Sequence, residues 1–530
     1  MKKQLTIIAC IGILQVTAVK LSAQAVLVKD INPGITTSSP DYFATMGNNL
    51  FFRANKITTG IDPYISNGTD SGTLILKDAS DPHSFTVVGS TLYFFADDAL
   101  ENKHLWKSDG TSTGTSEIKQ VLAKNFFTDP DLITSYNGMI IFRAYNQLWK
   151  SDGSATGTVM IRDTVVNGGK DNSFVELAGK LYFKGMNSGT GTELWVTDGT
   201  SAGTMMVKDI NPGTLSGMDV VSGGSPDGLN WITVYNGALY FRAEGTEFDD
   251  ELWKSDGTAA GTVLFKDINT TTGDGSGVCN LTKMNGSLYF TADDANPGEE
   301  LWKTDGTTAG TVLIAGYNEF GEMVMMNNAL YFSGKDGTNG EQLWKSDGTT
   351  AGTAMLKVIK TGGNATIEEI KSIGNAVYFS ANNGVNGKEP WVSDGTAAGT
   401  LMIHDIKPGS SGSTPKGFTK AGVSVFFSAD DGVNGTELWK TGTITTGQSR
   451  IAKTNKILVY PNPNGGQFTI ALSNPELIAD VKIINILGET VFNKSISGSE
   501  EIQIPEAIPG IYLLIISNNL ECFKSRMVIH

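Results

Sequence analysis

One segment of 18 residues recurs along most of this chain, and the recurrence constrains the fold more than any other feature. ELWKSDGTAAGTVLFKDI at 251–268 returns as ELWVTDGTSAGTMMVKDI at 193–210 and as ELWKTDGTTAGTVLI at 300–314. A degenerate copy at 62–73 has Tyr64 at the tryptophan position. A tryptophan marks each of eight further copies, 42 to 58 residues apart: Trp106, Trp149, Trp195, Trp253, Trp302, Trp344, Trp391 and Trp439. A repeat of this length predicts one supersecondary unit per copy, stacked on its neighbours.

Each copy follows a short strand, a Gly or Asn turn and a strand of alternating apolar residues, as in YNGALYFRA and MNGSLYFTA. With the ELW strand, the DGT turn and the TVLFKDI strand, this makes four strands per repeat. Short strands, recurring turn signals and no helical periodicity indicate an all-β chain. Four strands per repeat of this length predict a multi-bladed β-propeller.

The two ends of the repeat region are complementary. The last copy, TELWK at 436–440, lacks the final strand, whereas AVLVKDINPG at 25–34 is a strand of that missing type. We expect the N-terminal strand to complete the last of about nine four-stranded blades and so to close the ring, which removes exposed sheet edges. Eight blades, or an open stack, are the alternatives.

The recurring letters resemble the ELWxxDGT repeat of exported bacterial proteins. The resemblance covers residues 26–441, and the six fixed letters occur in full at 193–200, 251–258 and 300–307, with departures such as EPWVSDGT at 389–396. The resemblance implies a propeller-like fold and no established activity. We interpret the tryptophans as packing between neighbouring sheets; a ring of exposed aromatics for sugar stacking is the alternative.

The first 25 residues are typical of a secretory signal peptide. Lys2 and Lys3 precede an apolar run that ends near the small residues at 23–25, and the run is too short for a membrane span. We therefore expect no transmembrane segment in the mature protein. Of the cysteines, Cys279 and Cys522 would remain after cleavage, and they lie in different predicted domains. A formal charge of −15 disfavours nucleic acid as a partner.

Paired aspartates precede several ELW strands, and carboxylates in Gly- and Asn-rich loops suit Ca²⁺. No cofactor is required by the sequence, and solvated turn carboxylates are the simpler interpretation of these aspartates, since none matches the EF-hand loop. The candidate calcium ligands are Asp97, Asp98, Asp293, Asp294, Asp430 and Asp431. Four histidines without an HExxH or CxxC pattern argue against zinc.

Basic residues share one repeat position, F-R-A, in several copies. On one arc of a ring they could bind an anionic group, although pairing with carboxylates of the blades is the simpler interpretation. The long insertion at 214–229 precedes a tryptophan outside the repeat, and long loops on a regular scaffold often carry recognition. The candidate ligand-binding residues are Arg53, Arg143, Lys184, Arg242 and Trp231.

A different composition begins after a polar linker at 442–456. Residues 457–530 hold β-rich runs separated by Asn, Gly and Pro, which predict a small Ig-like β-sandwich. This domain resembles the type A C-terminal sorting domain of the type IX secretion system. The residues that carry the resemblance include Tyr460, Pro461, Asn462, Pro463, Gly510, Tyr512 and Lys524. The resemblance implies contact with the type IX machinery and passage through the outer membrane.

These features predict a secreted or cell-surface protein. We expect a non-catalytic propeller that binds an extracellular glycan or protein. A glycan-active hydrolase or lyase is the alternative, because carboxylates are plentiful, but neither a G-x-S-x-G elbow nor a P-loop is present.

Overall fold

The computed structural model describes most of the chain as two compact units, Met1–Thr445 and Thr446–His530. The described residues of the first unit are 24–124, 129–163, 174–187, 189–218, 232–245, 249–271, 273–296, 298–316 and 319–442. Those of the second unit are 457–460, 466–472, 478–485, 489–497, 499–504, 508–517 and 522–529. All regular elements in these segments are β-strands. Among them no helix has the length and apolar content to cross a membrane. The predicted signal peptide, 1–25, falls almost wholly outside the described residues.

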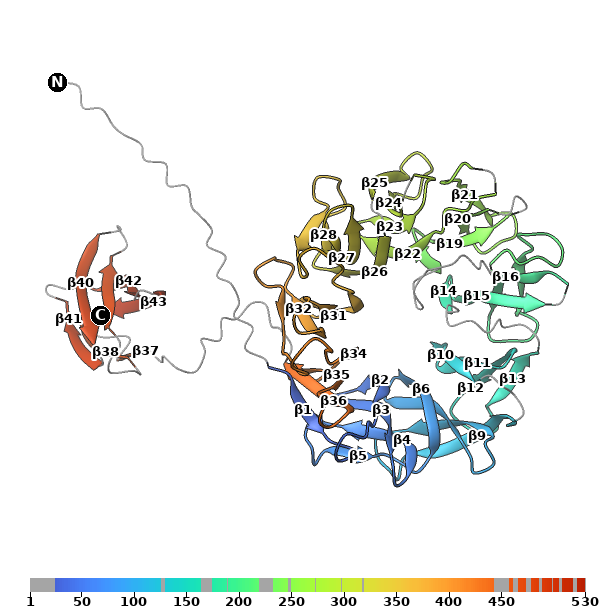
Figure 1. The fold of residues 1–530 in the computed structure, drawn as a ribbon, viewed down its shortest axis with the longest axis horizontal. Helices are drawn as coiled ribbons and strands as arrows, with labels where there is room; N and C mark the ends of the chain where they lie inside the picture. Colours follow the sequence, from blue (N-terminus) through green and yellow to red (C-terminus); the bar gives the residue numbers. More distant parts are fainter. Residues whose placement is uncertain are drawn as a thin grey trace, which may run out of the picture. The chain divides into compact units, whose positions relative to one another are not determined.

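The first unit consists of four-stranded antiparallel sheets arranged in a circle (Figure 1). Its first four sheets contain β2 Asp41–Met46, β3 Asn49–Lys56, β4 Gly60–Ser66 and β5 Thr73–Ile75; β6 Ser80–Val88, β7 Thr91–Asp97, β8 Lys103–Ser108 and β9 Ser116–Leu122; β10 Asp131–Tyr136, β11 Met139–Ala144, β12 Gln147–Ser151 and β13 Val159–Arg162; β14 Val175–Leu177, β15 Lys180–Asn187, β16 Gly191–Thr197 and β17 Met205–Lys208.

The chain continues around the circle with the same strand order. The next four sheets contain β18 Ile232–Tyr235, β19 Ala238–Glu244, β20 Asp250–Ser255 and β21 Val263–Lys266; β22 Cys279–Met284, β23 Ser287–Ala292, β24 Glu300–Thr304 and β25 Val312–Gly316; β26 Glu319–Met326, β27 Ala329–Asp336, β28 Gly340–Ser346 and β29 Ala354–Lys357; β30 Glu368–Ile373, β31 Ala376–Asn382, β32 Lys388–Ser393 and β33 Leu401–Met402. The last sheet contains β34 Lys416–Ala421, β35 Ser424–Asp430, β36 Thr436–Gly442 and β1 Val26–Lys29.

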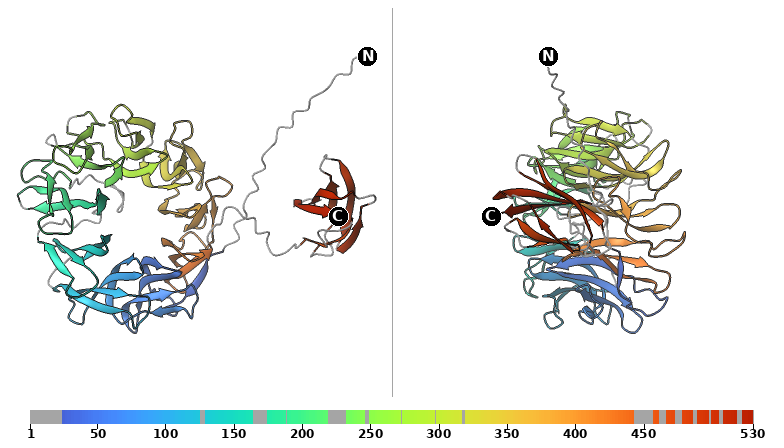
Figure 2. Two further views of the ribbon diagram at one scale, coloured as in Figure 1. Left: turned by 180° about the vertical axis from the view of Figure 1, so that it is seen from behind. Right: turned by 90° about the vertical axis from the view of Figure 1, so that its left-hand side faces the viewer.

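Alternating apolar residues form these strands because both faces of every sheet are covered. On β19, Phe241 and Ala243 pack towards the preceding sheet, whereas Tyr240 packs towards the following sheet. Trp253 lies between β18–β21 and the preceding sheet and is 8% exposed, so this repeat tryptophan is a packing residue. The first strands of most successive sheets contact one another on the inside of the circle (Figure 1), and β2 contacts β34. Figure 2 shows the stacked sheets from behind and edge-on.

The N-terminal strand completes the last sheet, as the complementary ends of the repeat predict. Val26 pairs with Lys440 and Leu27 with Trp439, in antiparallel register. Across the junction, Val28, Phe52 and Leu438 share one core. The chain is therefore all-β, with a β-propeller whose last sheet joins both ends of the repeat region.

Antiparallel order gives the ring two different faces. The turns between first and second strands and the DGT turns between third and fourth strands lie on one face, which we call the turn face. The connections between second and third strands, and those from one sheet to the next, lie on the opposite face, which we call the loop face. The turn face repeats nearly the same short turns, whereas the loop face carries segments of different length and composition.

The second unit contains two sheets around one core. One has the order β37–β38–β41 and the other β40–β39–β42–β43. The strands are β37 Ile457–Tyr460, β38 Gln467–Leu472, β39 Ile478–Ile484, β40 Thr490–Ser497, β41 Ser499–Gln503, β42 Gly510–Ser517 and β43 Cys522–Ile529. Phe468, Ile483 and Leu514 are among the buried residues that the two sheets share. The Ig-like connectivity stays a prediction. The unit boundary lies within the predicted linker, of which 443–456 are outside the described residues.

Candidate functional site

The glutamate of the ELW segment is a buried clamp on the connection to the next sheet. Glu251 is 1% exposed, and its two carboxylate oxygens accept hydrogen bonds from Ile268 N at 2.8 Å and Asn269 N at 3.2 Å. Burial raises the pKa of Glu251 to about 7, against the bonds from these amides, which lower it. At the same position Gln342 Oε1 accepts from Ile359 N and Lys360 N. The recurring acid is thus structural.

The residues of the DGT segment also stabilise the fold. Asp256 Oδ1 accepts hydrogen bonds from Thr258 N and Thr258 Oγ1 at 2.9 and 2.7 Å, which lowers the pKa of Asp256. Gly257 has a φ of +91° and lies against the Tyr182 hydroxyl of the preceding sheet. These contacts recur around the ring, so the repeated residues of the turn face stabilise the fold.

The basic residues predicted to bind an anion lie near the loop face, but each of the three arginines among them is already paired with a carboxylate. Arg53 on β3 binds Asp41 through Nε at 2.6 Å and Asp81 through Nη1 at 2.9 Å. Arg143 on β11 pairs with Asp131, and Arg242 on β19 pairs with Asp250. These ion pairs match the simpler of the two sequence interpretations.

The other two predicted ligand residues are Lys184 and Trp231. Lys184 lies on β15 opposite Leu194 of β16, at the same register position as the arginines. Trp231 lies outside the described residues, as does the segment 219–231 to which most of the long insertion belongs. Anion binding by this set stays a prediction.

Two of the three predicted calcium aspartate pairs are occupied by lysine. Lys103 Nζ lies 2.8 Å from Asp97 Oδ2, and Lys407 Nζ binds Asp430. Asp98 accepts bonds from its own loop, with Asn102 the main contributor, which lowers the pKa of Asp98 to about 2. Asp431 likewise binds Val433 N and Asn434 N. At both sites a cation of the protein already neutralises one of the carboxylates.

The third pair forms a denser acidic cluster. Carboxylate oxygens of Asp293, Asp294 and Glu300 lie within 4.8 Å of one another. Glu300, the ELW glutamate of this sheet, is 4% exposed and accepts a hydrogen bond from Asp294 N at 3.1 Å. Burial, followed by the charge of Asp294, raises the pKa of Glu300 to about 7. Oxygen-only donors at this spacing suit a hard divalent cation such as Ca²⁺.

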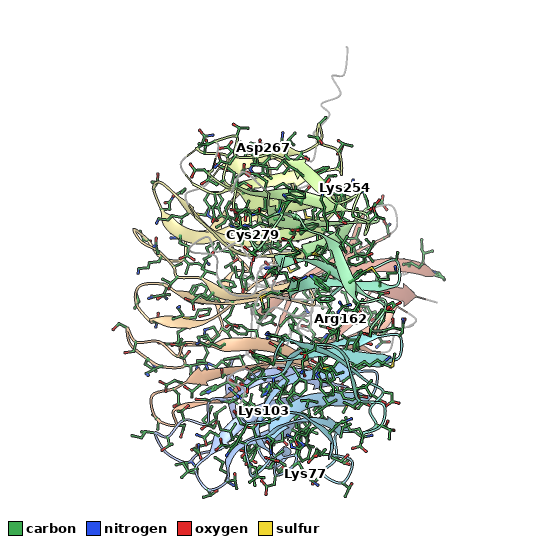
Figure 3. All side chains as sticks on the ribbon, turned by 90° about the vertical axis from the view of Figure 1, so that its right-hand side faces the viewer. Lys77, Lys103, Arg162, Lys254, Asp267 and Cys279 are labelled. Carbon is green, nitrogen blue, oxygen red and sulfur yellow. The ribbon has the colours of Figure 1, made fainter. Side chains whose placement is uncertain are left out.

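A larger polar cluster joins the inner strands of sheets β2–β5 and β6–β9 at the loop face. Asp81 and His83 on β6 lie beside Arg53 of the neighbouring sheet. His83 is 3% exposed, and burial lowers the pKa of His83 to about 4, so the imidazole is neutral at pH 7. Lys103, labelled in Figure 3, bridges Asp97 and Asp129, the latter at 3.0 Å.

Sequence reasoning identified Arg53 and Asp97 separately, as an anion ligand and a calcium ligand, and did not bring them together. It missed His83 and Lys103. One signal was available for the lysine: Asp97 and Lys103 flank a short loop between consecutive strands, so antiparallel pairing sets them opposite each other. His83 stands outside every recurring letter, and nothing in the sequence distinguishes it.

The sorting-domain residues lie partly in the described segments of the second unit. Tyr460 ends β37, and Gly510 begins β42, where it pairs with Ile529. The Tyr512 hydroxyl donates to Ile508 O at 2.7 Å. Lys524 on β43 pairs with Ile515. Pro461, Asn462 and Pro463 lie outside the described residues.

Comparison with solved structures gives remote likenesses. Puromycin hydrolase is 14% identical, with a TM-score of 0.35, over 66% of this chain and 59% of that chain. An uncharacterized protein from Listeria monocytogenes EGD-e is 11% identical, with a TM-score of 0.36, over 72% and 97%. The β-propeller domain of the trilobed protease from Pyrococcus furiosus is 13% identical, with a TM-score of 0.30, over 59% and 96%.

The chain thus spans little more than half of the length of puromycin hydrolase, and likenesses this remote say nothing about activity. No curated protein matches the chain. Residues 458–530 match the family described as secretion system C-terminal sorting domain. Residues 458–530 are therefore a sorting domain of the type IX secretion system, which supports a secreted or cell-surface location for the protein.

Proposed function

We propose that this protein is an exported, non-catalytic β-propeller that binds an extracellular glycan or protein through its loop face. In this proposal residues 1–25 direct entry into the periplasm, and the sorting domain directs passage through the outer membrane. We further infer that the nine four-stranded sheets found in the described residues of the first unit are the blades of one closed ring.

The proposal rests on a difference between the turn face and the loop face. The recurring Glu, Asp and Gly residues of the repeat are engaged in clamps, turns and contacts between sheets. The loop face is free to vary, and its tips expose apolar side chains, such as Val385 at 71% and Val433 at 66%. Exposed apolar tips beside polar loops are typical of recognition surfaces.

The ion pairs of the loop face favour binding over catalysis. A general base needs a carboxylate or imidazole that can receive a proton from a substrate. Asp41 and Asp81 are bound to Arg53, and Asp97 and Asp129 are bound to Lys103. Carboxylates held in this way are fixed hydrogen-bond acceptors, which suits recognition of a ligand.

The test compares matched substitutions on the two faces. The purified full chain is applied to arrays of extracellular glycans and matrix proteins, and ligands that bind are incubated with it for product analysis. Val433→Asp on the loop face should abolish binding, whereas Val423→Asp on the turn face, at a residue 82% exposed, should not. Equal effects of the two substitutions, or turnover of a bound glycan, would contradict the proposal.

Export has its own test. Removing residues 458–530 should leave the propeller in the periplasm, and the full chain should reach the surface or the medium. Fractionation of cells with an intact type IX system measures both. Normal export of the truncated chain would show that another segment carries the signal.

A further inference from the structure

Tyr42 is an aromatic ring presented at the loop-face end of an inner strand. It lies at a β-bulge of β2, where the register with β3 shifts between Asp41 and Ala44, and its φ is +53°. Left-handed φ values at or beside equivalent inner-strand bulges also occur in other sheets, at Leu132, Asn280 and Glu369. Among these residues only Tyr42 is aromatic, and it is 46% exposed. The bulge is therefore part of the scaffold, and the ring is a feature of this sheet.

The orientation of the Tyr42 ring is fixed from one side by Arg53. The guanidinium carbon lies 4.6 Å from the ring centroid. Asp41 holds the guanidinium through two bonds, from Nε at 2.6 Å and from Nη2 at 3.1 Å, and Asp81 binds Nη1. A planar cation held by two carboxylates cannot follow a moving ring, so the ring is a preorganised platform.

A buried polar group without a partner lies next to this platform. The ring of His83 lies 6.2 Å from that of Tyr42 and is 3% exposed. Its Nδ1 contacts Ser84 Oγ at 3.1 Å, but its Nε2 has no hydrogen-bond partner among the described residues. Asp97 Oδ1, on the same side of sheet β6–β9, is also buried and without a partner. Other buried atoms of the propeller also lack a partner within the described segments, Asp62 Oδ2 and Trp253 Nε1 among them. His83 Nε2 and Asp97 Oδ1 differ in that they belong to one polar cluster that also presents an exposed aromatic ring, where a ligand or its waters can complete the bonding.

Resting on the proposed binding function, we infer that Tyr42, Arg53, Asp41 and Asp81 form a subsite for a neutral saccharide. The exposed face of Tyr42 would stack on the C–H face of a pyranose ring. Asp41 and Asp81, with side chains 47% and 40% exposed, would accept hydrogen bonds from ring hydroxyls, and Arg53 would donate to them.

The charge of the cluster supports a neutral ligand. Four carboxylates face two cations, so an anionic glycan would meet net repulsion. Each carboxylate is nevertheless bound to a cation, and one face of Tyr42 is already covered by Arg53. A cationic peptide would therefore have to compete with Arg53 and Lys103 for the same oxygens, whereas hydroxyl groups can use the lone pairs that the ion pairs leave open.

The test measures binding of the full chain to immobilised neutral oligosaccharides of glucose, mannose, galactose and xylose, with polygalacturonate oligosaccharides and oligolysine as charged probes. Tyr42→Ala should weaken binding of the best neutral oligosaccharide about tenfold or more, and Tyr42→Phe should retain most of it, because the stacking face is kept. Tyr145→Ala is the matched control: Tyr145 is also exposed, at 38%, with a φ of +57°, and lies outside the cluster. Thermal unfolding of each variant checks that the ring is folded.

The outcomes separate the subsite from the broader function. If a neutral oligosaccharide binds and Tyr42→Ala and Tyr145→Ala weaken it equally, or not at all, the subsite is wrong and the binding function stands. If only oligolysine or polygalacturonate binds, or only a protein ligand whose binding Val433→Asp abolishes, the saccharide assignment is overturned while the loop-face function stands. Absence of binding to every glycan and protein probe would refute both.

Discussion

The closure of the ring can be tested at a single buried carboxylate. Glu437 on β36 is fully buried and binds the connection that follows β1, some 400 positions earlier in the chain. Its Oε2 accepts from Ile31 N at 3.0 Å and Ser38 Oγ at 2.6 Å, and its Oε1 accepts from Ser38 N at 3.1 Å. Glu437→Ala would remove the carboxylate that accepts from Ile31 N, and it would leave Ser38 N and Ser38 Oγ with Thr436 O as their acceptor. Because these donors lie on the segment that joins the two chain ends, we expect the junction to open first.

The expected magnitude follows from those three bonds. A buried donor left without a partner costs about 1–3 kcal/mol, and each of the two donors that keep Thr436 O loses about 0.5–1 kcal/mol, so we expect a loss of about 2–4 kcal/mol. A ring of roughly 420 residues has an unfolding entropy near 0.9 kcal/mol/K, so the loss corresponds to a Tm lower by about 2–5 °C. Locally the effect should be larger, since the lost hydrogen bonds hold the segment that directly follows strand β1.

Hydrogen exchange of the β1 amides, together with thermal unfolding, measures both effects. Glu437→Gln should cost roughly half as much, since an amide keeps one acceptor oxygen, as Gln342 does naturally in sheet β26–β29. Glu251→Ala is the internal control, because it removes the same clamp where the chain is continuous. Unchanged exchange of β1 in Glu437→Ala, or equal exposure of β1 in Glu251→Ala, would refute the idea that this glutamate closes the ring.

Three further predictions concern the scaffold and the acidic cluster. The pKa of Glu251 is about 7 in the folded protein against an ordinary value of 4.5, so its contribution to stability is complete below about pH 4.5 and is lost as pH rises through 7; the Tm should be higher at pH 5 than at pH 8, and Glu251→Gln should reduce this difference. Gly257→Ala should lower stability by about 2 kcal/mol or more, because Tyr182 occupies the space of the new Cβ, whereas Gly286→Ala, with a similar φ and open surroundings, should lose only about 1 kcal/mol in the same melting assay. Added Ca²⁺ should raise the Tm of the full chain, an effect that Asp294→Asn removes and Asp431→Asn keeps; a shift that survives Asp294→Asn would place the ion elsewhere.

Much of the propeller could be predicted because the residues of each repeat determine its turns and strands locally. The DGT letters predict a turn, and the structure shows Asp256 bonded to its own loop. The pairing of β1 with β36 could be predicted because one end of the array lacks a strand that the other end supplies. Both inferences need only the local chemistry of a turn and a count of strands, so no distance between separate parts of the chain has to be known.

The loop-face cluster could not be predicted for the opposite reason. Its members stand on two neighbouring sheets and on the connection to a third, and their proximity depends on the rotation between sheets, which no spacing in the sequence records. Lys407 shows this well: it lies 23 residues before Asp430 and reaches it across the loop face from the connection after β33. A carboxylate pair therefore looks the same in sequence whether a lysine neutralises it or a third acid joins it.

The acidic pairs of the loop face differ in whether a lysine neutralises them. Asp97 and Asp430 occupy equivalent places at the ends of β7 and β35, and each is matched by a lysine, though from different parts of the chain. Asp293, at the end of β23, is joined instead by Asp294 and Glu300. The two lysines come from different parts of the repeat, which indicates that the fold accepts a carboxylate at the end of the second strand when a cation neutralises its charge. No lysine is paired with Asp293 among the described residues, and we therefore predict that a divalent ion bound from outside neutralises this cluster.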